Sequence, residues 1–327
     1  MSDSQQKTIE TYQKLVNASA LMQTFAIGRR LGVFYLLVQG QKSVSEMANA
    51  LGLVERPLEL FLDQLVETGY IERYGEDYAI SVLGKMLPDE LADLGDRYYS
   101  RMESWLRTGD RIEDPETPFD DSDFGREKRA FEWMTTPNAL EMLQILNIGQ
   151  SRKGMKVVEL SCGSAVMSSA FGYHDPEMKV CLVDNSENLA RARETAESIG
   201  IAERCQFIEA DPTVVDFQFK ADLIVLSCQL CRFDDVALKS LLKNAAGQLQ
   251  KSGEIVIVDE FSETPEARFS NRNAALLTEF RSPLGRQRDR KQVTDLLYAC
   301  GFVDALYSDL RSAPGTRGVL VAGVSKV

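Results

Sequence analysis

Apolar and polar residues alternate with two different periods along the C-terminal half of the chain. Five apolar runs of strand length occur at residues 155–161, 179–184, 205–211, 221–227 and 253–260. Residues 188–200 and 234–253, which lie between these runs, have helical periodicity. Strands that alternate with helices predict a parallel sheet with helices on both faces. Two last runs, 302–310 and 317–325, are joined by a short Pro-Gly link, which predicts an antiparallel pair.

The N-terminal half begins with a long helical pattern over residues 7–38. Its apolar positions include Tyr12, Leu15, Val16, Ala20, Met22, Ala26 and Leu31. Such a helix needs a partner that buries its apolar side chains. We therefore expect this part of the chain to associate with a second copy.

The next segment predicts a winged helix. A short helix is expected at 46–51, with Ser43 and Ser45 both suitable as its cap, and a second helix begins at Pro57. Residues 70–81 then alternate around a Gly-Glu-Asp turn, which indicates a β-hairpin. The second helix carries four acids against one arginine and would repel a DNA duplex. Dimerisation is the favoured use of this module.

Composition narrows the function classes further. The chain has 327 residues and a net charge of -12, which disfavours nucleic acid as a partner. No apolar run approaches the roughly 20 residues that cross a bilayer, and the polar start does not predict a signal peptide. Six scattered cysteines suit a reducing compartment, so we expect a cytoplasmic protein with no membrane partner.

Candidate ligand-binding residues lie where the predicted strands end. The first strand contains Glu159 and is followed by a loop of small residues at 161–165. Asp184 ends the second strand, where an acid can bond a ribose diol, and Asp211 ends the third, beside the expected place of an adenine. Each aspartate alone has a second interpretation as a helix cap. Three acids on successive strands favour a nucleoside site.

The loop itself indicates which nucleoside. It has one glycine, Gly163, where a pyrophosphate dinucleotide favours three, and no Walker lysine follows. An adenosine ligand with a positive sulfonium and an amino-acid tail needs less of a phosphate cradle and is compatible with carboxylates. The sequence therefore predicts S-adenosylmethionine as cofactor, with S-adenosylhomocysteine as product.

With these residues in view, the chain resembles the small-molecule O-methyltransferases of the acetylserotonin and plant phenolic type, which carry an N-terminal winged-helix dimerisation domain. The resemblance is carried by residues 105–110, 157–165, 182–189, 207–212, 233–260 and 296–302. It implies an α/β Rossmann-like methyltransferase fold plus a mainly helical winged-helix domain, and a homodimer. We expect a dimerisation domain at 1–100, a helical connection lining the substrate pocket at 101–150, and a cofactor-binding domain at 151–327.

The resemblance assigns cofactor contacts to Glu159, Ser161, Gly163, Asp184, Asp211 and Ser227. The sequence departs from the family pattern at four of its places. Ser161 and Ala165 stand where the family has glycine, Glu159 stands for aspartate, and Ser227 stands for lysine. Each change adds bulk at the cofactor or removes a donor.

The expected catalytic residue also differs. In the family the fourth strand is followed by a catalytic histidine, and Cys231 occupies that place here. The two carboxylates that orient the histidine map to Asp259 and Gln287. His174, the only histidine, precedes the second strand and belongs to the opposite end of the sheet. Cys231 and Asp259 are therefore the catalytic candidates, and the usual histidine base is missing.

Several functions remain open from the sequence. Methyl transfer could persist on an acidic or already activated acceptor, which needs no strong base. The fold could instead carry out other chemistry on a related small molecule, or form a non-catalytic dimer. Cys228 and Cys231, with Cys162, could form a redox or metal pair, although a zinc site lacks a fourth ligand and we predict no metal.

The acceptor is expected between the carboxyl edge of the sheet and the helices of residues 100–150. Phe131, Met134 and Met142 are candidate pocket walls, with core packing as the alternative. An arginine cluster at 281–290, above all Arg286 and Arg288, is the best candidate for recognising an acidic substrate.

Overall fold

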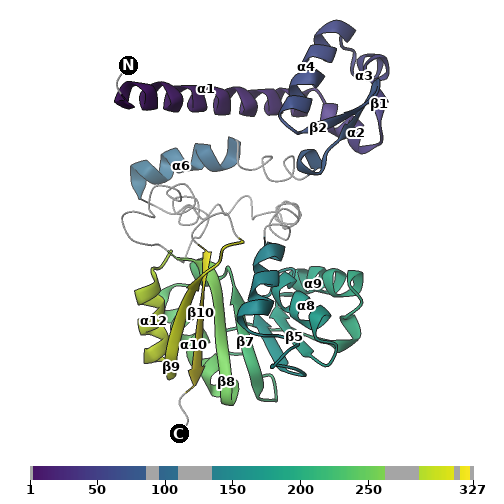
Figure 1. Cartoon of the computed structure of the whole chain (residues 1–327). Coiled ribbons are helices and arrows are strands. Elements are labelled where there is room, and N and C mark those ends of the chain that lie inside the picture. The colour runs from purple at the N-terminus through teal and green to yellow at the C-terminus, as the bar shows by residue number, and fades with distance from the viewer. Residues whose placement is uncertain (1–2, 86–95, 110–134, 262–286, 313–316, 325–327) are drawn as a thin grey trace. The chain divides into compact units, whose positions relative to one another are not determined.

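The computed structural model describes residues 3–85, 96–109, 135–261, 287–312 and 317–324. Described residues up to Ser100 form one compact unit, and described residues from Arg101 onward form a second. Figure 1 shows both, with the first from purple to blue and the second from the blue of α6 (Asp96–Thr108) through teal to yellow. No helix among these residues is long and apolar enough to cross a membrane.

The C-terminal unit is built on a seven-stranded sheet with the order β6-β5-β4-β7-β8-β10-β9. Its strands are β4 (Lys156–Leu160), β5 (Lys179–Asp184), β6 (Cys205–Glu209), β7 (Ala221–Ser227), β8 (Leu249–Glu260), β9 (Phe302–Asp309) and β10 (Arg317–Val324). Strands β4 to β8 pair parallel with one another, and β10 pairs antiparallel with both β8 and β9. The predicted fold class, a Rossmann-like and mostly parallel sheet with a C-terminal antiparallel pair, is confirmed.

Two strand boundaries differ from the expectation. β6 ends at Glu209 instead of Asp211, and β8 begins at Leu249, inside the segment predicted to be helical. Leu249 pairs with Ala221 at the start of β7, so sheet pairing overrides the helical pattern of its sequence. The preceding helix therefore ends at Gln248.

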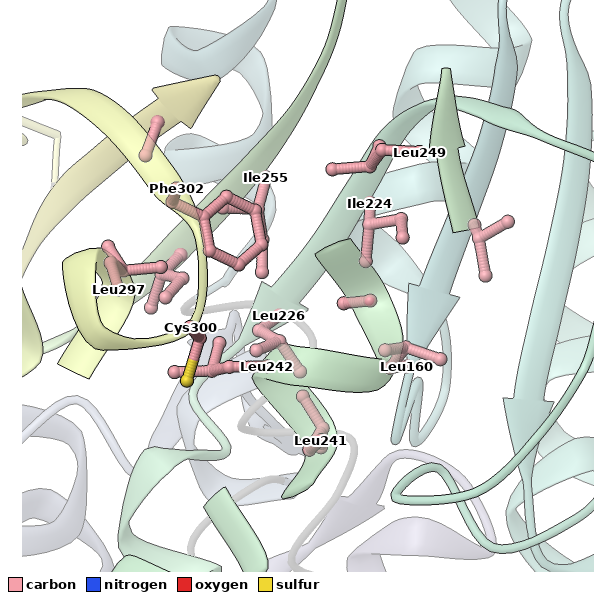
Figure 2. Packing of buried hydrophobic residues seen from close by; sticks show 14 of the residues in the cluster. Leu160, Ile224, Leu226, Leu241, Leu242, Leu249, Ile255, Leu297, Cys300 and Phe302 are labelled. Carbon is pink, nitrogen blue, oxygen red and sulfur yellow. The ribbon is translucent and has the colours of Figure 1, made fainter. Parts of the chain in front are cut away.

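Helices cover both faces of this sheet. One face carries α8 (Val166–His174), α9 (Ser186–Ser198) and a helix at 135–145, and the other carries α10 (Asp235–Gln248) and α12 (Arg290–Ala299). A short 3-10 turn, η1 (Ala202–Arg204), precedes β6. Successive strand residues face opposite sides, so Leu223 packs with the first group and Ile224 with the second. Figure 2 shows side chains of this second core, among them Leu242 from α10, Phe302 from β9, and Leu226 and Ile255 from β7 and β8.

The N-terminal unit is mainly helical. It contains α1 (Asp3–Arg30), α2 (Val33–Val38), α3 (Val44–Leu51), α4 (Glu55–Glu67) and a small sheet of β1 (Lys42–Ser43), β3 (Asp77–Ile80) and β2 (Ile71–Tyr74); α6 (Asp96–Thr108) follows. The helix expected over 7–38 is broken, because Gly32 adopts a φ of 81° that ends α1 and opens α2. The core of the N-terminal unit includes Phe25, Phe34 and Leu62.

The cap of α3 is decided by the structure. Ser43 accepts a hydrogen bond from the backbone N–H of Glu46, and the Glu46 carboxylate accepts one from the backbone N–H of Ser43 at 2.8 Å. This capping box satisfies two backbone donors that the helix itself leaves without a partner. Ser45 lies inside the first turn and is exposed.

We expect Ser43→Ala to lower the free energy of unfolding of the N-terminal unit by about 1 kcal/mol, because the capping hydrogen bond is lost. Urea unfolding followed by circular dichroism measures the change. Ser45→Ala is the matched control and should leave stability within about 0.5 kcal/mol of the unchanged protein. Equal losses in both variants would contradict the assigned cap.

Candidate functional site

A cleft of about 510 Å³ opens where β4, β5, β6 and β7 end. Its lining comes from the loops after these four strands: Ser161, Asp184, Asn185, Glu209, Ala210, Asp211, Pro212, Arg232 and Phe233. The carboxyl edge of a parallel sheet is the usual place for ligands in α/β folds. Three of the residues predicted from the sequence, Ser161, Asp184 and Asp211, thus meet around one cleft.

The loop after β4 has an unusual backbone. Ser161, Gly163 and Ala165 all adopt left-handed conformations, with φ of 53°, 54° and 56°. A residue other than glycine costs roughly 1–2 kcal/mol in this region. The backbone therefore keeps a shape that glycine suits at 161 and 165, although the side chains there have changed. An added Cβ at Gly163 would meet no atom within 4 Å, so the loop leaves open space at that point.

Asp184 ties this loop to the end of β5. One carboxylate oxygen accepts the Gly163 N–H at 2.8 Å, and the other accepts the Asn185 N–H and the Asn188 side-chain amide, each at 2.8 Å. The residue is buried. A carboxylate has about four acceptor positions, so these three bonds leave capacity for a ligand hydroxyl. Asp184 therefore lines the cleft and also holds the loop after β4 in place.

Asp211 and Glu209 form the far end of the cleft. Asp211 is exposed, and one of its oxygens accepts the Thr213 N–H at 2.8 Å and the Thr213 hydroxyl at 2.7 Å. Glu209 is the last residue of β6 and lines the cleft as well. Sequence reasoning missed Glu209 because it placed the end of this strand two residues later. The same shift hid Ala210 as a lining residue.

Glu159 lies beneath the loop. It is buried in β4, and its carboxylate accepts the Ser168 N–H at 3.1 Å in the first turn of α8. Burial, assisted by the charge of Asp184, raises the pKa of Glu159 to about 7. Glu159 does not line the cleft; it holds the start of α8 against the strand.

The segment after β7, residues 228–235, borders the cleft and is called the strap. Cys228 has a φ of 54° and donates its N–H to the Val258 carbonyl at 2.7 Å. A 3-10 turn, η2 (Leu230–Arg232), follows, and the Leu230 N–H bonds to Asp259 at 2.9 Å. Arg232 and Phe233 from this strap line the cleft. Ser227, the last residue of β7, is buried beneath it.

Arg288 holds the strap from its other side. Its guanidinium is buried and donates to the Leu230 carbonyl at 2.7 Å, to the Phe233 carbonyl at 2.8 Å, and to Asp235 at 2.7 and 3.1 Å. The expectation that Arg288 recognises substrate is therefore wrong, because its donors are engaged by the protein. Arg288 directly precedes Asp289, the N-cap of α12, and nothing in this local sequence indicates that the Arg288 side chain is buried.

Cys231 is half-buried and Asp259 is buried. Burial, together with the charge of Asp259, raises the pKa of the Cys231 thiol to about 12. Burial likewise raises the pKa of Asp259 to about 6, against the bonds from Leu230 and Glu260 that lower it. Cys231 is thus a neutral thiol at pH 7, whereas Asp259 is mostly ionised. Gln287 donates to the Glu260 carbonyl at 3.4 Å.

Other candidates fall away from the cleft or outside the description. His174 ends α8 just before β5, at the amino edge of the sheet. None of the six cysteines forms a disulfide, and no group of three or more His, Cys, Asp or Glu side chains among the described residues is placed to hold a metal. Met142 packs in the core. Phe131, Met134 and Arg286 lie outside the described residues.

Comparison with protein families decides the class to which this fold belongs. The profile of the O-methyltransferase domain family matches residues 120–303, which is more than half of the chain. The chain belongs to this family. It is therefore a methyltransferase by descent, and the cofactor of the family is S-adenosylmethionine, as the sequence predicted.

Relatives of this methyltransferase act on small molecules. A 3-hydroxy-5-methyl-1-naphthoate 3-O-methyltransferase of Streptomyces sahachiroi is 24% identical and covers 92% of this chain and 91% of its own. Human N-acetylserotonin methyltransferase, solved with S-adenosylmethionine, is 18% identical with a TM-score of 0.73 over 99% of this chain and 100% of its own. The pyocyanin biosynthetic protein PhzM is 19% identical with a TM-score of 0.74 over 98% and 99%. These two structures establish the shared fold.

We expect Glu159→Gln to flatten the pH dependence of stability between about pH 4.5 and 7. The pKa of Glu159 rises from its usual 4.5 to about 7 on folding, so its stabilising effect is complete below pH 4.5 and is lost as the pH rises through 7. The loss is on the order of 3 kcal/mol. Denaturant unfolding at pH 4.5 and pH 8 measures the change in the free energy of unfolding between the two pH values. The same change in Glu159→Gln as in the unchanged protein would contradict the raised pKa of Glu159.

Proposed function

We propose that this protein transfers a methyl group from S-adenosylmethionine to a small-molecule acceptor that is acidic or already activated. The cleft at the carboxyl edge supports the cofactor part of the proposal, since it unites acids from β5 and β6 with the loop after β4. The half-buried, neutral Cys231 supports the acceptor part. Membership of the O-methyltransferase family supports the reaction class.

The residues of the cleft fit the proposed cofactor. A volume of about 510 Å³ suits a nucleoside with an amino-acid tail. Asp184 has an acceptor position left for a ribose hydroxyl, and Asp211 and Glu209 suit the amino group of adenine. Phe233 offers an aromatic surface for the base. The carboxylates also suit the positive charges of the ligand. When bound, S-adenosylmethionine supplies an electrophilic methyl group on a sulfonium.

The roles of Ser161, Gly163 and Ser227 follow from their places. Gly163 gives the loop its open space and its N–H to Asp184, and Ser161 borders the cleft. Ser227 ends β7 below the strap and provides a hydroxyl where the family pattern has a lysine. Glu159 acts indirectly, through the start of α8.

The methyl acceptor must already be acidic or ionised, because the described part of the site provides no strong base. A thiol with a pKa near 12 does not accept a proton at pH 7, so Cys231 is not the general base. Asp259, with a pKa of about 6, is the better candidate beside the strap. A weak base of this kind suits an acidic hydroxyl or a preformed anion, for which positioning provides most of the rate gain.

We further propose a homodimer formed through the N-terminal domain, whose α3, α4 and hairpin β2–β3 have the order of a winged helix. The supporting observation is the surface of α1, on which large apolar side chains are exposed: Ile9, Tyr12, Leu15, Val16, Leu21 and Met22. A second copy of the helix would bury them. Free cysteines throughout the chain are consistent with a cytoplasmic location.

Calorimetric titration with S-adenosylmethionine and S-adenosylhomocysteine tests the cofactor site. We expect both to bind, and Asp184→Ala to weaken both by about tenfold or more, because a charge-assisted hydrogen bond and a support of the loop are lost. Asp216→Ala is the control, since this carboxylate bonds only to Gln218 in the structure and lies outside the cleft. Absence of binding to the unchanged protein would refute the methyltransferase proposal.

Sedimentation equilibrium tests the dimer. Leu15→Asp places a charge among the exposed apolar residues of α1 and should convert the dimer to a monomer. Gln13→Asp introduces the same charge at a polar position of the helix and should leave the dimer intact. A monomeric unchanged protein, or a dimer that persists in Leu15→Asp, would contradict the proposed interface.

A further inference from the structure

Arg232 is a cation in a cleft whose other charged residues are all acidic. It lines the cleft together with Asp184, Glu209 and Asp211. We propose that Arg232 recognises a carboxylate of a bound ligand. The inference rests on the proposed function and adds to it a residue that selects for a negative group.

The guanidinium of Arg232 is available for a ligand. It donates one hydrogen bond, from Nη1 to the Gln229 side-chain oxygen at 3.2 Å, and forms no ion pair with a described carboxylate. An arginine has five N–H donors in a fork that matches a carboxylate. Arg288, in contrast, directs four hydrogen bonds to the protein. The two arginines of this region therefore have different roles.

The strap fixes where Arg232 stands. Both backbone polar groups of Leu230 are hydrogen-bonded. Its N–H donates to Asp259 at 2.9 Å, and its carbonyl accepts from Arg288 at 2.7 Å. The Phe233 carbonyl is bound by Arg288 as well, at 2.8 Å. Arg232 lies between these two anchored residues, so its backbone is positioned before any ligand binds. Such preorganisation reduces the entropy that binding would otherwise cost.

The charge pattern of the cleft defines the ligand class. Three carboxylates repel an anion, and Arg232 is the group in the lining that offsets this for one negative group. A ligand, or a pair of ligands bound together, that carries positive groups and one carboxylate would complement the three acids and Arg232. The carboxylate could belong to the amino-acid tail of the cofactor or to an acidic acceptor bound beside it, and the same arginine chemistry serves either.

Two pairs of ligands separate these sources by calorimetry. S-adenosylhomocysteine carries the amino-acid tail, and 5′-methylthioadenosine lacks it. In the second pair, 3-hydroxy-2-naphthoate carries a carboxylate that 2-naphthol lacks, and both are titrated with S-adenosylhomocysteine present. We expect Arg232→Gln to weaken the carboxylate-bearing member of one pair by about three- to tenfold and to leave its partner unchanged. Arg232→Lys should restore part of the affinity.

Controls separate this inference from the proposed function. Lys153→Gln removes the same charge from an exposed position before β4, at the amino edge, and should change no affinity. Equal weakening of both members of each pair, or no weakening, would overturn the role of Arg232 while leaving cofactor binding intact. Failure of S-adenosylhomocysteine to bind the unchanged protein would refute the proposed function, and the naphthoate pair alone would then decide on Arg232. Absence of binding in both pairs would overturn both.

Discussion

Hydrogen bonds from loop backbone to buried charges hold the carboxyl edge of the sheet in shape. Asp184 binds the loop after β4, Asp259 binds the strap after β7, and Arg288 binds the same strap from its carbonyl side. Each is a charge-assisted bond, and the two that hold the strap are buried, where such bonds are stronger than on a surface. The cleft exists because these side chains satisfy the loop groups that the strands leave without partners.

The same burial shapes the chemistry that the edge can perform. It raises the pKa of the Cys231 thiol to about 12 and that of Asp259 to about 6. The Cys231 thiol therefore stays neutral at pH 7, and the nearby Asp259 carboxylate is left as a weak base. The acidic acceptor that we propose is compatible with such a weak base, and the proposed role of Arg232 agrees with a negative charge on it.

Three residues other than glycine adopt left-handed conformations at the carboxyl edge of the sheet. Ser161 and Ala165 keep conformations that favour glycine, and Cys228 adopts a third after β7. These conformations are unfavourable for their side chains and are maintained by the surrounding bonds, such as the one from Cys228 to Val258. The tertiary contacts of the edge therefore set the loop geometry, and the residue types within the loop do not.

The sequence by itself determined the fold class, the antiparallel final pair, Asp184 at the end of β5 and Asp211 shortly after β6, because apolar periodicity and polar residues after it are local properties. Tertiary structure decided the rest. It selected Ser43 over Ser45 as a cap, placed Glu209 in the cleft by ending β6 early, and separated Arg288 from Arg232. Arg288 and Arg232 are the same residue type, yet Arg288 is buried by contacts with residues 53 to 58 positions away in the sequence. Local pattern contains no record of such contacts, so only the folded chain distinguishes a buried support from a residue facing a ligand.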